Sequence, residues 1–235
     1  MEGSGVYSPE GKAIAGWREV FMKNVLVIGA GRFGRYTCEK LNEIGCQVLL
    51  IDRNEKRLAK ALTYVTGSLI GDSTERDFMA TIGVSDFDFC VVAIGDDFLS
   101  SLETTFLLKE LGAKRVISRA TSGSQEKFLL RNGADSVVFP ERQLGTWTAI
   151  RYSSDGISDY FELMDGYAIF ELDTPDSWDG CRIADLDVRK KYGFNILGVK
   201  NGRMNMEING DTILRRGQHM LVLGNEQLIR KRFKL

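Results

Sequence analysis

The chain has 235 residues, 43% of them hydrophobic, which is typical of a soluble globular protein with one large domain or a medium domain and a smaller one. Its 31 basic and 32 acidic side chains balance, so nothing predicts a nucleic-acid partner. No apolar run approaches the roughly eighteen residues that span a bilayer.

The N-terminal segment and two rare residue types narrow the possible functions further. Residues 1–21 are glycine-rich and lack an apolar core, so we expect an extension outside the fold and not a signal peptide. Four scattered cysteines without a C-x-x-C spacing indicate reduced structural thiols in a cytosolic protein. His219 is the only histidine, which argues against histidine-based catalysis and a typical zinc site.

A glycine motif follows the first predicted strand, Val25–Ile28. Gly29, Gly31 and Gly34 stand in the order G-x-G-x-x-G. We expect Gly29 to allow a tight turn, Gly31 to let a phosphate approach the backbone, and Gly34 to let the next helix pack closely on the sheet. The free N–H groups and dipole of that helix would then favour an anion.

A second apolar strand, Val48–Ile51, follows the helix and ends at Asp52. Strand, helix, second strand and acid fall at the spacing of a dinucleotide-binding unit, in which such an acid binds the ribose hydroxyls. This spacing favours a nucleotide site over the alternative, a glycine turn with only a structural role.

Strands and helices alternate as far as about residue 142. Further strands are predicted at residues 65–70, 89–94, 115–118 and 136–139. Helices are predicted at residues 54–62, 74–82, 97–111 and 125–131. The second of these helices has a possible capping box made by Thr74 and Asp77. Six alternating strands predict a doubly wound parallel Rossmann sheet with a ligand crevice at the carboxyl ends of its strands.

Residues in the glycine turn and at the strand ends are candidates for nucleotide contacts. Arg32 is expected to bind an oxyanion through its guanidinium, with a solvated surface arginine as the alternative. Arg53 could accept a 2′-phosphate, but the acid before it argues against NADP. Asp72 is a candidate for the ribose or for a helix cap. The remaining candidates are Ala30, Phe33, Ser73, Ala93, Ile94 and Gly95.

Glu141 follows the sixth predicted strand. It is either a first-turn acid favoured by the helix dipole or a residue that helps hold a divalent cation against bound phosphates. Leu144–Tyr152 predicts a helix with Trp147 and Ile150 exposed to something apolar, either an ordinary closing helix or a crossover helix at a dimer interface.

The last part of the chain predicts a small α+β domain after a hinge at residues 153–156. Strands are expected at residues 167–172, 194–200 and 218–223. Helices are expected at residues 183–192 and 225–233. No catalytic motif is recognisable in this part, and a hydride-transferring enzyme would need an acid–base group beside its cofactor.

The chain resembles the N-terminal RCK domain of the Trk/Ktr potassium-uptake regulators in six motifs: V-I-G-A-G-R-F-G, L-I-D-R-N, G-D-S-T, V-A-I-G-D-D, V-I-S-R-A and N-G-A-D-S-V-V-F-P-E. Its segments D-G-C-R-I-A-D-L-D-V-R-K-K-Y-G-F-N-I-L-G-V-K and R-R-G-Q-H-M-L-V-L-G are similar to the small C-terminal lobe of these proteins. On this resemblance, residues 1–21 are an extension, 22–143 the nucleotide-binding domain, 144–158 a crossover helix and hinge, and 159–235 the C-terminal RCK lobe.

The resemblance implies a cytosolic, non-enzymatic regulator at the inner face of the cell membrane. Such regulators form dimers, usually in an octameric ring, under a membrane potassium channel or transporter. ATP and ADP compete for the crevice, and NAD(H) binds in some members. The resemblance assigns Arg32 to the terminal phosphate, Asp52 and Asn54 to the ribose and adenine side, and Arg119 to the phosphates. It links Glu141 to a divalent cation such as Mg²⁺ or Ca²⁺.

In some Ktr regulators the C-terminal lobe binds cyclic di-AMP through a D-x-R-x5-N-[IV] pattern. Asp187, Arg189, Asn195 and Ile196 stand in that pattern. The alternative is a solvated helix face followed by a core strand. Met206 departs from the family, which often has a proline there. Two rival functions are an NAD(H)-dependent oxidoreductase and an NAD(H) redox sensor; a DNA-binding sensor lacks support, since no helix-turn-helix or basic patch is recognisable.

Overall fold

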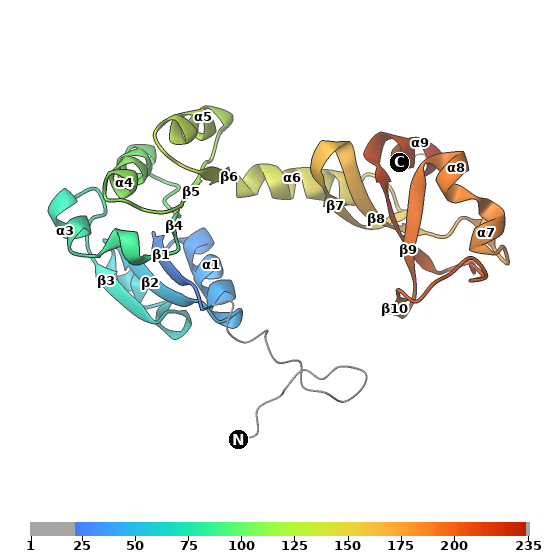
Figure 1. Ribbon diagram of the computed structural model, residues 1–235, viewed down its shortest axis with the longest axis horizontal. Helices are drawn as coiled ribbons and strands as arrows, with labels where there is room; N and C mark the ends of the chain where they lie inside the picture. The colour runs from blue at the N-terminus through green and yellow to red at the C-terminus, as the bar shows by residue number, and fades with distance from the viewer. Residues whose placement is uncertain (1–21, 234–235) are drawn as a thin grey trace, which may run out of the picture. The chain divides into compact units, whose positions relative to one another are not determined.

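The computed structural model describes residues 22–233, so the expected N-terminal extension lies outside the described residues. The described chain forms two compact units, which divide between Pro140 and Glu141 (Figure 1). Within residues 22–233, no helix combines the length and the apolar character that crossing a membrane would require.

The N-terminal unit contains six strands in the order β3-β2-β1-β4-β5-β6, and every neighbouring pair is parallel. The strands are β1 (Asn24–Ile28), β2 (Gln47–Asp52), β3 (Gly67–Ile70), β4 (Phe89–Val92), β5 (Val116–Arg119) and β6 (Ser136–Val138). This order reverses direction between β1 and β4, as in a doubly wound dinucleotide-binding fold. The predicted Rossmann sheet is confirmed.

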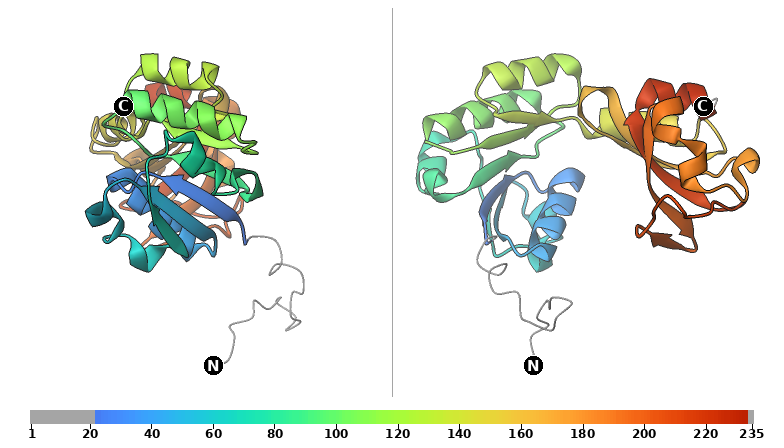
Figure 2. Two further views of the ribbon diagram at one scale, coloured as in Figure 1. Left: turned by 90° about the vertical axis from the view of Figure 1, so that its left-hand side faces the viewer. Right: turned by 45° about the vertical axis from the view of Figure 1, so that its right-hand side comes forward.

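Helices cover both faces of this sheet (Figure 2). They are α1 (Arg32–Glu43), α2 (Glu55–Leu58), α3 (Arg76–Ala80), α4 (Phe98–Glu110) and α5 (Gly123–Arg131). Val25 and Val27 of β1 pack in one core with Cys38 and Leu41 of α1. The alternate residues of β1 pack on the other face with α3 and α4. Burial on both faces explains why the central strands are apolar throughout.

Two predictions about the short helices were wrong. Thr74 and Asp77 form no capping box, because α3 begins only at Arg76 and the Thr74 hydroxyl donates to Asp72 at 2.8 Å. The helix expected over residues 54–62 ends at Leu58 and is followed by a separate 3₁₀ turn, η1 (Leu62–Tyr64).

The C-terminal unit contains a five-stranded antiparallel sheet in the order β10-β9-β11-β8-β7, which confirms the small α+β lobe. Its strands are β7 (Ile157–Glu162), β8 (Tyr167–Asp173), β9 (Phe194–Asn201), β10 (Arg203–Asn205) and β11 (His219–Asn225). Its helices are α6 (Pro140–Arg151), α7 (Ile183–Leu186), α8 (Val188–Tyr192) and α9 (Glu226–Phe233). The C-terminal unit also has the 3₁₀ turns η3 (Met164–Gly166) and η4 (Asp176–Trp178). A further 3₁₀ turn, η2 (Val84–Asp86), belongs to the N-terminal unit.

The N-terminal part of this second unit differs from expectation. Ile150, expected to face something apolar, is 8% exposed and belongs to the unit's own hydrophobic core, against which Trp147 also packs, as the closing-helix alternative implies. Helix α6 begins at Pro140, earlier than predicted, and β7 was not predicted at all. The helix expected over residues 183–192 is broken into α7 and α8 at Asp187.

Candidate nucleotide-binding site

The glycine turn between β1 and α1 has the geometry of a phosphate loop. Gly29 has a φ of +102°, and its N–H donates to the Ile51 carbonyl at 2.7 Å. A Cβ on Gly34 would lie 1.9 Å from the Gly29 carbonyl oxygen, so only glycine fits there. A Cβ on Gly31 would meet no atom within 4 Å, and no side chain caps the start of α1. An anion could therefore approach the N–H groups of the first turn of α1.

Asp52 fixes the end of β2 to this turn. One carboxylate oxygen accepts the Ala30 N–H at 2.6 Å, and the other accepts the Asn54 N–H at 2.7 Å. Asp52 is 6% exposed, so these two bonds compensate for the burial of its charge. Asn54 also caps α2, since its side chain accepts the Arg57 N–H at 3.2 Å. A ribose would have to share the Asp52 oxygens with the backbone.

Arg119, from the end of β5, lies against the glycine turn and the end of β4. Its guanidinium carbon is 5.8 Å from the centroid of the Phe33 ring. A Cβ on Gly95 would lie 2.3 Å from an Arg119 nitrogen, so this glycine leaves room for the guanidinium. A Cβ on Gly29 would meet the Ala93 backbone at 3.2 Å. The fold thus gathers residues from β1, β4 and β5, which are distant in sequence.

Arg32 is the first residue of α1, and its side chain is exposed. Ile94, directly before Gly95, is partly buried in the core beneath α3 and α4. These positions place Arg32 beside the open turn and give Ile94 a packing role in addition to any ligand contact.

Asp72 and Ser73 make hydrogen bonds within the protein. Asp72 accepts the Thr74 N–H at 3.0 Å and the Thr74 hydroxyl at 2.8 Å, and these bonds hold the pKa of the Asp72 carboxyl below its usual value. Asp72 therefore closes a local turn and does not cap α3. The Ser73 hydroxyl is buried and lies 2.8 Å from the Thr104 hydroxyl of α4.

Two ion pairs that the sequence did not predict join the loops after β2 and β4. Arg53 lies 3.7 Å from Asp97, and Arg57 lies 3.8 Å from Asp96. Asp97 also caps α4 by accepting the Ser100 N–H at 3.1 Å and the Ser100 hydroxyl at 2.7 Å. These Ser100 bonds lower the pKa of the Asp97 carboxyl. A sequence signal for the cap existed in Asp97-x-x-Ser100, but the ion pairs depend on sheet order.

Two of the four residues of the cyclic di-AMP pattern are in direct contact in the C-terminal unit. Arg189 of α8 donates from Nε to the Asn195 side-chain oxygen at 2.7 Å. Ile196 of β9 packs against the unit's core, and Asp187 has a left-handed backbone between α7 and α8. The side chain of Met206 lies over β9, where its sulfur is 2.7 Å from a Cβ built on Gly198.

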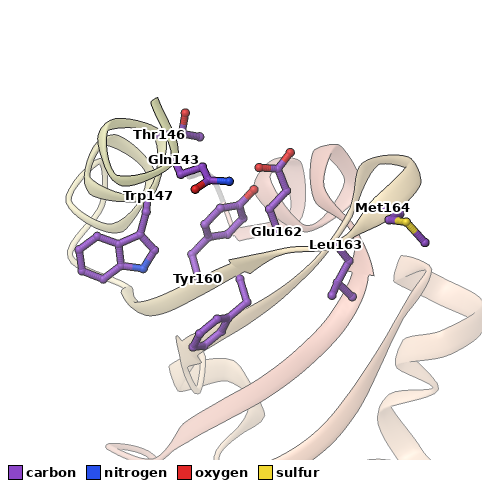
Figure 3. A pocket seen from close by; sticks show the side chains of 8 residues that line it. Gln143, Thr146, Trp147, Tyr160, Glu162, Leu163 and Met164 are labelled. Atoms are coloured by element: carbon purple, nitrogen blue, oxygen red, sulfur yellow. The ribbon is translucent and has the colours of Figure 1, made fainter. Parts of the chain in front are cut away.

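A hollow of about 820 Å³ lies between α6 and β7 of the C-terminal unit (Figure 3). Figure 3 shows Trp147 of α6 on one side of it and Tyr160 of β7 facing it. Phe161, Leu163 and Met164 make most of the remaining lining apolar, and three polar side chains also line the hollow: Gln143, Thr146 and Glu162. Met164 is 83% exposed and Phe161 is 54% exposed, which is unusual for such large apolar side chains.

Glu141 is the second residue of α6 and belongs to the C-terminal unit. Among residues 22–233, no three His, Cys, Asp or Glu side chains come close enough together to hold a metal ion by themselves. A divalent cation held by one carboxylate would need its other oxygen ligands from phosphates or water.

Comparisons with known proteins agree with this architecture. Residues 25–140 match the TrkA-N domain, and residues 167–235 match the TrkA-C domain. The chain is similar to the Ktr system potassium uptake protein A of Bacillus subtilis (strain 168), with 34% identity over 213 residues, 90% of this chain and 96% of that protein.

Two solved structures share the fold. The GsuK channel bound to NAD is 17% identical with a TM-score of 0.63, over 89% of this chain and 38% of that chain. GsuK bound to ADP is 16% identical with a TM-score of 0.50, over 59% of this chain and 36% of that chain. The chain has a TrkA-N domain, a TrkA-C domain and a relative of nearly equal length in the potassium uptake protein A of Bacillus subtilis. It therefore belongs to the Trk/Ktr potassium uptake protein family.

Proposed function

We propose that the chain is a nucleotide-sensing regulatory subunit of a potassium channel or transporter, without enzymatic activity of its own. Binding to that membrane partner would hold it in the cytoplasm, at the inner face of the membrane. The observation that carries the proposal is the open glycine turn at Gly31, held by the carboxylate of Asp52. Membership of the Trk/Ktr family supports the role in potassium transport.

ATP and ADP are the ligands that we propose, with NAD(H) as a further possibility. The likeness to channel structures with bound NAD and bound ADP supports an adenine nucleotide in this fold. In this assignment the phosphates lie at the start of α1, Asp52 and Asn54 hold the ribose and adenine side, and Arg119 stabilises the phosphates. Arg32, exposed at the open end of the turn, would contact the terminal phosphate.

Regulation by these ligands requires that ATP and ADP favour different conformations. A ligand shifts a conformational equilibrium only through its different affinities for the two states. The two ligands differ by one phosphate, so we place that difference at Arg32. The change would alter the hinge of a dimer, and the dimers would assemble into a ring, which we propose to be an octamer.

Glu141 and the C-terminal unit carry two further parts of the proposal. Glu141 would supply one oxygen ligand to a Mg²⁺ or Ca²⁺ ion bound with the nucleotide phosphates. Asp187, Arg189, Asn195 and Ile196 would bind cyclic di-AMP, and the hydrogen bond between Arg189 and Asn195 supports their acting as one group.

Calorimetric titration with ATP, ADP, NADH and cyclic di-AMP, each with and without Mg²⁺, tests the proposal. We expect ATP and ADP to bind and Mg²⁺ to change the affinity for ATP. We expect Arg32→Ala to weaken ATP by about tenfold, because a charge-assisted contact contributes on the order of 1.5 kcal/mol, with ADP changed by less than about threefold.

Arg35→Ala is the matched control, since Arg35 lies one turn further along α1 and its loss removes the same positive charge as the loss of Arg32. Equal loss of ATP and ADP in Arg32→Ala would contradict the assignment of Arg32. NADH binding with turnover of a carbonyl substrate and no response to ATP or ADP would replace the proposal by an oxidoreductase.

A further inference from the structure

Four charged side chains form a bridge at the carboxyl ends of the strands of the N-terminal sheet. Arg53 and Arg57 belong to the loop and helix that follow β2, and Asp96 and Asp97 belong to the loop that follows β4. The pairs are 3.7 Å (Arg53–Asp97) and 3.8 Å (Arg57–Asp96) apart. Strands β2 and β4 flank β1 in the sheet. This arginine–aspartate bridge therefore spans the carboxyl end of β1, where the glycine turn begins.

The two aspartates of the bridge differ in how firmly they are held. Asp97 is fixed as the cap of α4 by Ser100, and its side chain is 39% exposed. The Asp96 side chain is 92% exposed, and Arg57 is the charged partner that it has within 4 Å among the residues that the structure describes. Asp97 consequently stays charged and stays in place whether or not Arg53 moves.

We infer that Asp97, with a smaller contribution from Asp96, makes the site select adenosine ligands with a free 2′-hydroxyl and reject those with a 2′-phosphate. This inference rests on the proposed nucleotide function of the site. The ribose of such a ligand would lie at Asp52, directly before Arg53, which is the cation best placed to neutralise a 2′-phosphate.

Arg53 is engaged by Asp97 instead of being available to a ligand. The pair is largely exposed, so its own strength is modest, and Arg53 could turn toward a phosphate. The fixed carboxylates are the larger obstacle. A 2′-phosphate carries between one and two negative charges near neutral pH, and it would approach both Asp52 and Asp97. Arg53 alone cannot neutralise all of these groups, and Arg57 is paired with Asp96.

Calorimetry with ADP and with ADP that carries a 2′-phosphate tests the inference, since the two ligands differ only in the group at issue. We expect the 2′-phosphate to weaken binding to the wild-type protein by at least about tenfold. Asp97→Asn keeps a side-chain oxygen for the α4 cap but removes the charge. This variant should bind the 2′-phosphorylated ligand about fivefold more tightly than the wild type does, and its affinity for ADP should change by less than about twofold.

Two further variants make the test specific. Glu103→Gln removes a negative charge from an exposed position of α4 that lies outside the bridge, and it should leave the ratio of the two affinities unchanged. Asp96→Asn should raise the affinity for the 2′-phosphorylated ligand only about twofold, because the Asp96 side chain is exposed and not fixed.

The possible failures are distinguishable. If ADP itself does not bind, the proposed function is wrong. If ADP binds and the 2′-phosphorylated ligand binds equally well, or if Asp97→Asn changes both affinities by the same factor, the proposed function stands and the selectivity assigned to Asp97 is wrong.

Discussion

The carboxylate of Asp52 accepts N–H groups from Ala30 at 2.6 Å and from Asn54 at 2.7 Å, one on each oxygen. Asp52→Asn would turn an amide N–H₂ toward one of these donors. Since the site is only 6% exposed, that donor would lose its partner. We predict that the free energy of unfolding of the N-terminal unit falls by about 1–3 kcal/mol without any ligand, and that ADP binding weakens as well.

Urea unfolding of the N-terminal unit can be followed by thiol labelling in a Cys46→Ala, Cys181→Ser background, which removes the two cysteines that are not fully buried. Cys38 and Cys90 are fully buried in this unit, and burial raises the pKa of both thiols to about 12, so the folded protein should react slowly. Asp72→Asn is the control, because a single Asp72 oxygen accepts both Thr74 bonds and an amide oxygen can replace it. A wild-type midpoint for Asp52→Asn would show that the two bonds contribute no stability.

The glycine turn could be predicted from sequence because each glycine answers a local steric requirement. Gly34 is the clearest case, since a Cβ there would lie 1.9 Å from a carbonyl oxygen a few residues away along the chain. The bridge between Arg53 and Asp97 could not be predicted in the same way. It depends on β2 and β4 flanking β1, which only the three-dimensional order of the strands establishes.

At the scale of elements, β7 escaped sequence analysis because its pattern is irregular. A half-buried strand is recognised by alternation of apolar and polar residues. The pairing of β7 with β8 shifts register between Ile157 and Asp159. The buried residues Ile157 and Tyr160 are therefore three positions apart, which breaks the expected period of two. Long, regular elements such as α1 and α4 were found, whereas the short helices α2 and α3 were predicted too long.

The break between α7 and α8 depends on one residue. Asp187 has φ +45° and ψ +45°, a conformation that aspartate tolerates better than most residues and that glycine adopts freely. We predict that Asp187→Gly is at least as stable as the wild type, whereas Asp187→Ala is less stable by about 1 kcal/mol. Thermal unfolding followed by the fluorescence of Trp147 and Trp178, in a Trp17→Phe background, measures both changes.

Asp185→Ala serves as the comparison for Asp187→Ala. Asp185 lies within α7 and pairs with Arg182 at 2.9 Å on the surface, so its loss should cost less than about 0.5 kcal/mol. If Asp187→Ala is as stable as Asp187→Gly, the left-handed backbone is not what places the break. The glycine variant also separates the backbone role of Asp187 from its proposed ligand contact. It allows the left-handed backbone but removes the carboxylate proposed to bind cyclic di-AMP.

At the scale of the whole molecule, the two units bear different parts of the proposed mechanism. The N-terminal unit contains the glycine turn and the arginine–aspartate bridge, and the C-terminal unit contains the apolar hollow between α6 and β7. A sensor needs a means of passing its state to other subunits. The hollow is a described surface suited to such contact, because most of its lining side chains are apolar or aromatic and Phe161, Leu163 and Met164 are exposed.

We predict that this hollow is covered by a second copy of the chain in solution. Met164 is 83% exposed, so Met164→Glu should leave the fold intact. At an interface, the variant would bury a carboxylate without a partner, and burying an unpaired charge is strongly unfavourable. Sedimentation velocity over a range of concentrations should show self-association weakened by at least about tenfold. Weakened self-association of Met164→Glu would support the dimer-interface alternative for α6, which stays a prediction.

Met206→Glu is the matched control for this measurement. It makes the same chemical change in the same unit, at a residue that is 55% exposed and does not line the hollow. Self-association of Met206→Glu should equal that of the wild type. Equal weakening in both variants would indicate a general effect of added negative charge. A wild-type protein that stays monomeric at all concentrations would remove the hollow from the proposed assembly, and regulation would then have to pass through the membrane partner alone.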